Sequence, residues 1–296
     1  MTKLEDMIEE VARKLQSYTG FVGTYATLAE PITASASTFT LSGAVFADGS
    51  GIQPNSLIEI GTEIIFIQAI DRSTGAVTGA LRGFKGSTPT AHSAGAGVEA
   101  DPQFFRFDII TSINDTINNL YPSVFAMKAI TVTPQARQME FDLPATTLQV
   151  VSVQYKSHVS NQGYRTSLNW TFDSVGSNST GKSLSILDHY RNQPIQIIVF
   201  VEPTALAIGQ DFTVSGLESW LKETVIFGAC WRLISFIDVY KATNTAQVSG
   251  MNNSVAPIGS GTNLAKYFLG MYQQALEQAR QKQQKRFPAK IHWTNQ

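Results

Sequence analysis

The spacing of apolar residues switches between two periods along the chain, and this switch limits the folds that it can adopt. Apolar residues every three or four positions predict a helix, whereas alternation or a short apolar run predicts a strand. Helical spacing occurs at residues 2–18, from Asp101-Pro102 to Leu120, at 216–243, and from Leu264 onward. Two strand-like blocks, 23–100 and 125–214, lie between these segments. The pattern predicts an α+β protein in which two antiparallel β modules interrupt a helical part.

The two β blocks predict different modules. In the first block the strands are TFTL, SLIEI and EIIFIQAI, and Gly83 and Gly86 permit the positive-φ turns of a small barrel or sandwich. In the second block the strands are AITVTP, QMEFDL, LQVVSVQYK, SLNWTF, SLSIL and PIQIIVFVE, with SHVSNQGYR as one of the loops. Short strands at this spacing are typical of an antiparallel β-sandwich.

Three of the four predicted helices carry a single apolar stripe, and the third is apolar on nearly every side. Asp101 is expected to cap the second helix, because Asp is favoured before a first helical turn that contains Pro. The third helix is apolar almost all round, so we expect both of its sides to be covered. The stripes of the other helices are Leu4, Met7/Ile8, Val11 and Leu15; Phe105, Ile109, Ile113, Ile117 and Leu120; and Leu264, Phe268, Met271/Tyr272, Ala275/Leu276 and Ala279.

Composition excludes several classes of protein. The 296 residues are 43% hydrophobic and 15% charged, and the formal net charge is −1, which gives no overall attraction to nucleic acid or to an anionic membrane. A single cysteine, Cys230, excludes an intrachain disulfide and is expected to be a buried thiol. The opening residues are acidic, and no apolar run is long enough for a membrane helix. We expect a soluble, non-secreted protein without a membrane segment.

The stretch GSNSTGKS, from Gly176 to Ser183, matches the phosphate-binding pattern G-x-x-x-x-G-K-[ST]. Such a loop requires a buried parallel strand before it and a helix after it. Here the flanking residues SLNWTF and SLSIL both alternate as exposed antiparallel strands do. We therefore predict a solvated hairpin loop and no nucleotide cofactor.

The histidines do not form a recognisable site in the sequence. His189 follows Asp188, but adjacent strand residues face opposite sides and no nucleophile accompanies them. His92, His158 and His292 lie in separate turns, loops and the tail. Without clustered spacing, no metal site and no catalytic residues are predicted.

The C-terminal region combines positive charge with aromatic residues and has three interpretations. It could contact nucleic acid, or it could be a solvated helix end whose cations favour the helix C-terminus. It could also be a docking arm that fills a groove of a partner, possibly as an added strand. The residues assigned to this arm are Arg286, Phe287, Pro288, Lys290, Ile291, His292 and Trp293.

Several segments together resemble a family of phage proteins. The acidic first helix and the segments NDTINNLYPSVF, ESWLKETVIFGACWRLISFID and YFLGMYQQALEQARQKQQKRFP resemble the head-to-tail adaptor (connector) proteins of tailed bacteriophages. The stretch LIEIGTEIIFIQAI…GALRGFKGSTPTAHSAGAGV is similar to small β modules of phage neck and tail proteins. The helical resemblance covers roughly a third of the chain, and the β resemblance covers about another quarter.

The resemblance implies a fold and a role in the virion. The implied core is a four-helix adaptor-like bundle made of residues 1–22, 101–124 and 215–286, into which the β modules 23–100 and 125–214 are inserted before an arm at 287–296. The family forms a ring, usually twelvefold, between the portal protein and a tail or second neck protein. The implied localisation is the head–tail interface of the virion, after assembly in the host cytoplasm, with DNA passing through the ring without sequence-specific binding.

Two other classes of function remain open at this stage. A receptor- or glycan-binding tail protein would use aromatic residues of the β blocks, such as Tyr155, Tyr164, Trp170 and Tyr190. A nucleotide-dependent enzyme would use Lys182 and Ser183. The adaptor interpretation, with no enzymatic activity, accounts for more of the sequence than either.

Overall fold

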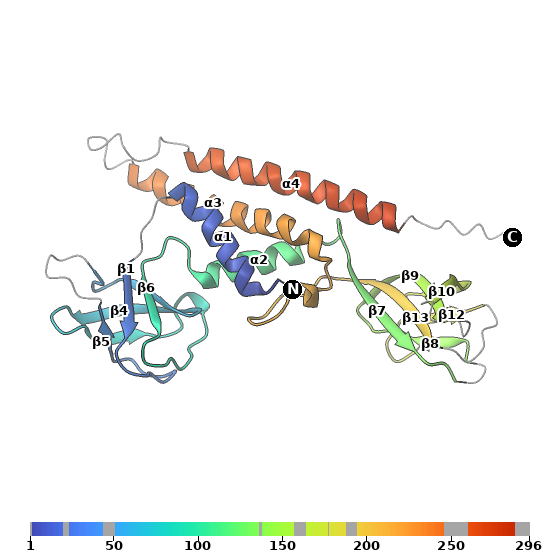
Figure 1. Ribbon diagram of the computed structural model, residues 1–296, viewed down its shortest axis with the longest axis horizontal. Helices are drawn as coiled ribbons and strands as arrows, with labels where there is room; N and C mark the ends of the chain where they lie inside the picture. Colours follow the sequence, from blue (N-terminus) through green and yellow to red (C-terminus); the bar gives the residue numbers. More distant parts are fainter. Residues whose placement is uncertain are drawn as a thin grey trace. The chain divides into compact units, whose positions relative to one another are not determined.

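The computed structural model describes residues 2–19, 24–43, 51–135, 138–156, 164–176, 178–187, 194–245 and 260–287 (Figure 1). These residues form four α helices and several antiparallel sheets, one of which is a closed six-stranded barrel. The predicted α+β class is therefore confirmed. The four-helix adaptor-like bundle stays a prediction, as do the proposed domain boundaries.

The described residues group into two compact units. The first takes its residues from Met1–Leu4, Asn114–Gly228 and Tyr267–Gln296, and the second from Glu5–Ile113 and Ala229–Lys266. Helices α2 (Arg106–Asn118), α3 (Lys222–Thr245) and α4 (Ser260–Arg286) each contribute to both.

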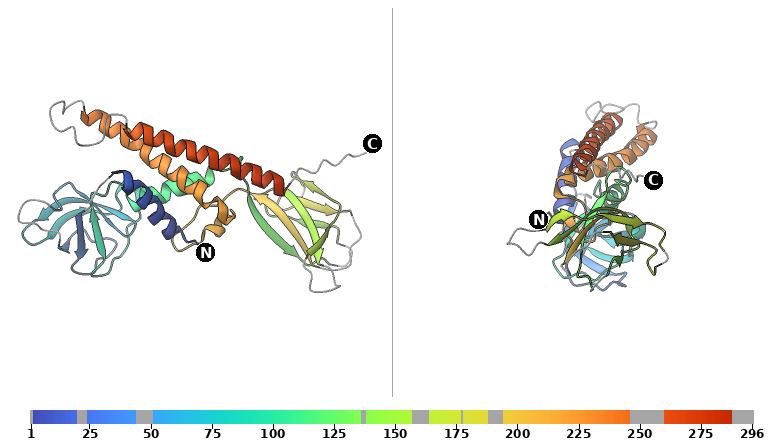
Figure 2. Two further views of the ribbon diagram at one scale, coloured as in Figure 1. Left: turned by 45° about the horizontal axis from the view of Figure 1, so that its top comes forward. Right: turned by 90° about the vertical axis from the view of Figure 1, so that its right-hand side faces the viewer.

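The second unit contains the barrel (Figure 2). The strand order is β1-β2-β5-β4-β3-β6, and all neighbouring strands are antiparallel. Buried aliphatic side chains such as Leu41, Ile58 and Ile65 fill its interior. The strands are β1 (Thr24–Leu28), β2 (Phe39–Ser42), β3 (Leu57–Ile60), β4 (Glu63–Asp71), β5 (Ala76–Leu81) and β6 (Gly97–Ala100). The sequence predicts β2, β3 and β4 individually, but not β1, β5 and β6, in which small residues such as Ala and Gly weaken the strand signal.

Helix α1 (Leu4–Thr19) confirms its predicted stripe, because Leu4, Met7, Ile8, Val11 and Leu15 are all buried. The stripe of α2 is buried as well, from Phe105 to Leu120.

The predicted cap of α2 is wrong. The helix begins at Arg106, beyond Asp101, whose carboxylate instead accepts a hydrogen bond from the Leu57 amide at 2.8 Å. Glu59 of strand β3 accepts from the amides of Arg106 at 2.5 Å and Phe107 at 3.4 Å. A side chain from a distant strand thus accepts hydrogen bonds from backbone N–H groups of the first helical turn, which have no partner within the helix.

The first unit contains two facing sheets. One has the strand order β10-β9-β13-β7 and the other β11-β12-β8. A single hydrophobic cluster takes residues from both sheets, including Phe141, Val153, Leu184 and Ile197, which is the arrangement of the predicted β-sandwich. The strands are β7 (Ala126–Val132), β8 (Glu140–Asp142), β9 (Thr147–Lys156), β10 (Tyr164–Ser167), β11 (Trp170–Asp173), β12 (Ser183–Ile186) and β13 (Ile195–Val201).

One strand of the sandwich differs from its prediction. The segment SLNWTF is not a single strand, because Ser167 ends β10 and Trp170 begins β11. Tyr164 and Arg165, expected in a loop, belong to β10 and pair with Lys156 and Tyr155 of β9. Leu168 is buried in the cluster between these strands, so the chain turns from one sheet to the other around it.

Three helices approach closely at Gly228 of α3. A Cβ atom there would lie 2.4 Å from the Thr116 Cγ2 of α2 and 3.0 Å from the Tyr272 ring of α4. Only glycine allows this approach without a shift of a neighbour.

The prediction that both sides of α3 are covered holds for its described side chains, since Val225, Ile226, Ala229, Cys230, Leu233 and Ile234 are all buried.

Candidate partner-binding site

The last turn of α4 is attached to the start of the sandwich by a paired hydrogen bond. The Gln283 Nε2 donates to the Phe125 carbonyl at 2.8 Å, and the Gln283 Oε1 accepts from the Phe125 amide at 3.0 Å. A side-chain amide thus pairs with the backbone as a neighbouring strand would. This pairing holds the end of α4 against the residue that precedes β7.

Aromatic rings continue this contact. The Phe125 and Phe200 rings stack with centroids 5.0 Å apart, and the Phe287 ring lies edge-on to Phe200 at 5.8 Å. Tyr121 adds a further edge-on contact to Phe125 at 5.7 Å. The aromatic row therefore runs from the end of α2 to the last described residue of the chain.

A pocket opens beside this aromatic row. Its volume is about 370 Å³, and its lining mixes aromatic rings with polar side chains of α4. A smaller pocket of about 110 Å³ shares Phe125, Gln283 and Phe287 with it and adds Trp220 and Lys282. The larger pocket is lined by Pro122, Ser123, Phe125, Phe200, Arg280, Gln283, Gln284 and Phe287. Pockets with aromatic walls and a few polar groups suit an apolar anchor of a partner.

Charged groups flank the smaller pocket. Glu218 accepts hydrogen bonds from both Arg286 and the Trp220 indole N–H. The Lys282 ammonium lies 5.1 Å from the Trp220 ring centroid, within the range of a cation–π contact. The basic end of α4 is thus joined to the segment before α3 by charge and by aromatic packing.

The structure describes two of the residues assigned to the docking arm. Arg286 is paired with Glu218, and Phe287 packs on Phe200. The other assigned residues, Pro288, Lys290, Ile291, His292 and Trp293, lie outside the described residues.

Phe125, Phe200 and Gln283 were missed as part of this site. The sequence offers a signal only for Gln283, which lies in the Gln-rich end of α4. Phe125 and Phe200 flank or occupy strands, where an aromatic residue indicates packing only.

The GSNSTGKS stretch is a hairpin loop. Strands β11 and β12 pair antiparallel on either side of it, with Asp173 opposite Ser183. The Lys182 ammonium donates to the Ser174 carbonyl at 2.9 Å. The side-chain Nδ2 of Asn178 donates to the Lys182 carbonyl at 2.8 Å. A strand, β12, follows the loop where a phosphate-binding loop would have a helix. The predicted hairpin is therefore confirmed, and Lys182 is engaged in closing it.

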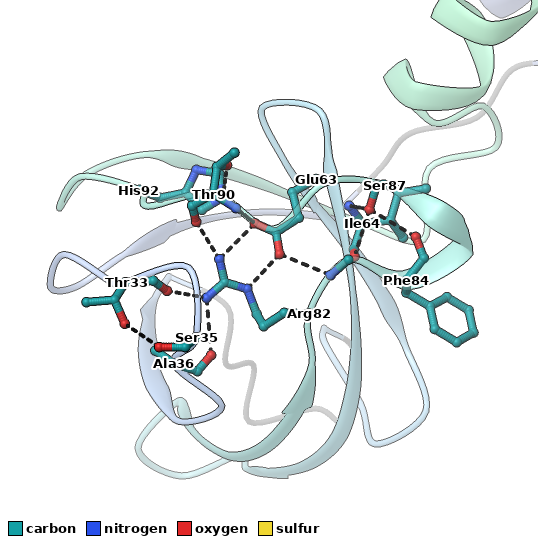
Figure 3. Close-up of polar contacts among 11 residues, drawn as sticks. Thr33, Ser35, Ala36, Glu63, Ile64, Arg82, Phe84, Ser87, Thr90 and His92 are labelled. Carbon is teal, nitrogen blue, oxygen red and sulfur yellow. Dashed lines mark hydrogen bonds and ion pairs between the residues drawn. The ribbon is translucent and has the colours of Figure 1, made fainter.

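A buried ionic cluster lies in the barrel (Figure 3). The Arg82 guanidinium donates from Nε to the Glu63 Oε1 at 2.7 Å and from Nη2 to the Oε2 at 2.8 Å. His92 Nε2 lies 2.8 Å from the same Oε2 and must carry a proton to donate to it. The Glu63 side chain is 0% exposed and that of Arg82 is 7% exposed.

The same cluster ties loops to the barrel. Arg82 also donates to the carbonyls of Thr33, Ala36 and Thr90, while Glu63 accepts from the Gly83 and Thr90 amides. Burial would raise the pKa of Glu63, but the hydrogen bonds from Arg82, Thr90 and His92 outweigh it and lower the pKa. Glu63, Arg82 and His92 thereby hold loops of the barrel together.

Glu59 is the other buried carboxyl group of the barrel. Its residue is 3% exposed, and burial raises its pKa to about 8 against the lowering effect of the Arg106 and Phe107 amides. Glu99 lies directly opposite it on β6. A carboxyl with this pKa is largely protonated at neutral pH, and it still caps α2 through Oε1.

The remaining candidate residues are structural where they are described. Cys230 is buried, which confirms the predicted buried thiol, and burial raises the pKa of this thiol to about 12. Tyr155 and Trp170 pack half-buried against the sandwich cluster, which limits their use as a glycan platform. The side chain of Tyr164, together with His158, Asp188, His189, Tyr190 and His292, lies outside the described residues.

Within the ranges given above, no group of three or more His, Cys, Asp or Glu side chains is placed to hold a metal ion. No helix in the described part of the chain is long and apolar enough to cross a membrane.

Comparison with known proteins gives no family assignment. No protein-family model matches the chain, and a search of curated proteins finds no significant match.

Proposed function

We propose that this chain is a structural virion protein that forms a ring at the head–tail interface. In this role it docks on the portal protein through its C-terminal arm, surrounds the DNA exit channel, and receives a tail or second neck protein on its other side. The ring is a homo-oligomer, and the resemblance of the helical segments to phage adaptors makes twelve subunits the expected number.

Incomplete burial of the α4 stripe is the observation that carries the proposal. Of the predicted stripe, Phe268 and Ala279 are buried, whereas Leu264, Met271, Tyr272, Ala275 and Leu276 are only half-buried. Tyr267, next to the stripe, is 52% exposed. A subunit that packs against neighbours in a ring leaves such surface for them to cover.

The anchored end of α4 supports the role of the arm. Gln283 and Arg286 hold the last turn through Phe125 and Glu218, so a segment that follows Phe287 starts from a defined point. An arm that starts from a fixed point loses less entropy when it docks than one on a free helix end. The near-neutral net charge of −1 suits a conduit that lets DNA pass.

Truncation tests the proposal. The cut belongs after Phe287, because Phe287 packs on Phe200 and its loss would disturb the sandwich. We expect a chain that lacks residues 288–296 to fold normally and to fail to join portal-containing capsids. A chain that lacks only residues 294–296 keeps every arm residue that is assigned to partner binding, from Arg286 to Trp293, and serves as the matched control. Normal capsid assembly by the longer truncation would refute the docking role.

A further inference from the structure

The pocket beside Phe287 lies where the described chain ends. Phe287 is the last described residue and lines both the larger and the smaller pocket. Phe125 and Phe200 form the aromatic wall of the larger pocket. Arg280 contributes a guanidinium whose side chain is 55% exposed and whose ion pair with Glu277 is long, at 3.9 Å. An apolar ring entering this pocket would meet aromatic faces and a cation that remains accessible.

The sequence after Phe287 contains suitable anchors. The segment PAKIHWTNQ places Ile291 and Trp293 two residues apart, on the same side of an extended chain. Each extended residue spans at most about 3.3–3.6 Å, so Trp293 reaches roughly 20 Å from Phe287. That length is sufficient for the chain to turn and return to the pocket that Phe287 lines.

We propose that this pocket is the docking site of the chain's own C-terminal tail, residues 288–296, with the Trp293 indole as its anchor. The indole packs against the phenyl rings of Phe125 and Phe200, and the Arg280 guanidinium lies over it in a cation–π contact. A tail joined to the pocket by a few residues has an effective concentration in the millimolar range. Even micromolar intrinsic affinity therefore keeps the pocket occupied in the free subunit.

Tail docking would regulate assembly, and this consequence rests on the proposed function. The arm stays on its own subunit until the portal offers a better site, which prevents premature association through the apolar side chains of Ile291 and Trp293. Occupation of the pocket itself does not depend on the proposed function. It is tested with the isolated protein, so the two can fail separately.

A peptide titration tests the inference. A fluorescein-labelled peptide of residues 288–296 is titrated with the chain truncated after Phe287 and with the full chain, at concentrations at which sedimentation shows monomers. We expect micromolar binding to the truncated chain and at least tenfold weaker binding to the full chain, whose own tail competes.

Two variants locate the contact. A peptide with Trp293→Ala leaves the protein unaltered and should lose at least tenfold in affinity. Arg280→Ala in the truncated chain should weaken binding several-fold, whereas Lys285→Ala, exposed on the same helix but outside both pockets, should not.

Three results with the monomeric protein would overturn the inference. They are no binding to the truncated chain, equal binding to the full and truncated chains, and equal binding of the Trp293→Ala peptide. Competition that appears only at concentrations at which the full chain associates would place the tail on a neighbouring copy, and would also overturn it. If the truncated chain does not bind the peptide and also fails to join capsids, the tail inference fails while the proposed function stands.

Discussion

Gln283 and Phe125 are 158 positions apart, yet the amide of one pairs with both backbone groups of the other. The contact joins the last turn of α4 to the residue at which the chain enters β7. It therefore fixes the position of the last turn of α4 within the first unit.

Loss of the Gln283–Phe125 hydrogen bonds should lower the free energy of unfolding of the first unit. We expect Gln283→Ala to lower the free energy of unfolding of the first unit by roughly 1–3 kcal/mol, because two hydrogen bonds are lost and the partly buried Phe125 groups stay unpaired. Gln284→Ala, exposed at the next position, should change it by less than about 0.5 kcal/mol. Urea unfolding monitored by hydrogen exchange of β7 and β13 provides the measurement. Equal effects of the two substitutions would contradict the assigned pairing.

Glycines in two helices should respond in opposite directions to alanine. Gly228→Ala places a Cβ 2.4 Å from the Thr116 Cγ2, so we expect overpacking to cost about 1–3 kcal/mol. Gly270→Ala meets nothing within 4 Å and should stabilise α4 by up to about 1 kcal/mol. Thermal unfolding of both variants tests this, and adding Thr116→Ser to Gly228→Ala should restore part of the loss. A stabilising Gly228→Ala would disprove the close helix approach.

Removal of the Glu63 charge from the buried ionic cluster should destabilise the barrel. We expect Glu63→Gln to destabilise the barrel by about 3–5 kcal/mol at pH 7, because the Arg82 guanidinium stays buried without its counter-charge. The pKa of Glu63 is lowered in the folded chain, so its stabilising contribution is present above about 4.5 and disappears as the pH falls through the folded pKa. Glu30→Gln, on an exposed residue, is the control. Hydrogen exchange of β4 and β5 would reveal the loss, and unchanged protection in Glu63→Gln would argue against the cluster.

Glu59 should give the barrel a pH dependence of the opposite sign. Its folded pKa of about 8 exceeds the unfolded value of 4.5, so the folded chain holds a proton that the unfolded chain has lost. We expect stability to fall as the pH rises from about 4.5 to about 8, by up to roughly 1.4 kcal/mol per pH unit, and then to level off. Glu59→Gln should abolish this slope, whereas Glu99→Gln should keep it. Urea midpoints at pH 6, 7, 8 and 9 would decide, and a slope that survives in Glu59→Gln would show that another group causes it.

Local periodicity predicted where the helices and strands lie better than it predicted which distant residues contact them. The stripes of α1 and α2 are readable because burial on one helix face leaves a three-to-four-residue pattern in the sequence. The same pattern contains no information about what caps α2. Only Asp101, next to the expected helix start, suggested a cap, whereas Glu59 lies 47 positions before Arg106. Strand β10 was missed because YRTS is polar and lies beside a stretch that resembles a loop.

The candidate site was predictable only in part. Charge and aromatic content led to the prediction that Arg286 and Phe287 belong to a docking arm, which stays a prediction. The pocket beside them depends on Phe125, Phe200 and Gln283, which come together only in the folded chain. In the barrel, Glu63, Arg82 and His92 come from separate segments, and their pairing is likewise a property of the closed fold. Long-range pairs of this kind leave no periodic signal in a single sequence.

Immunogold labelling tests the central claim most directly. The proposed function makes the chain part of a phage particle, so antibodies against it are applied to intact and tail-less phage particles, with an antibody against the major capsid protein as the control for access. The proposed function predicts gold at the neck of intact particles and at the tail-attachment vertex of tail-less ones. Gold at the tail tip, or none on either kind of particle while the capsid control labels, would contradict it.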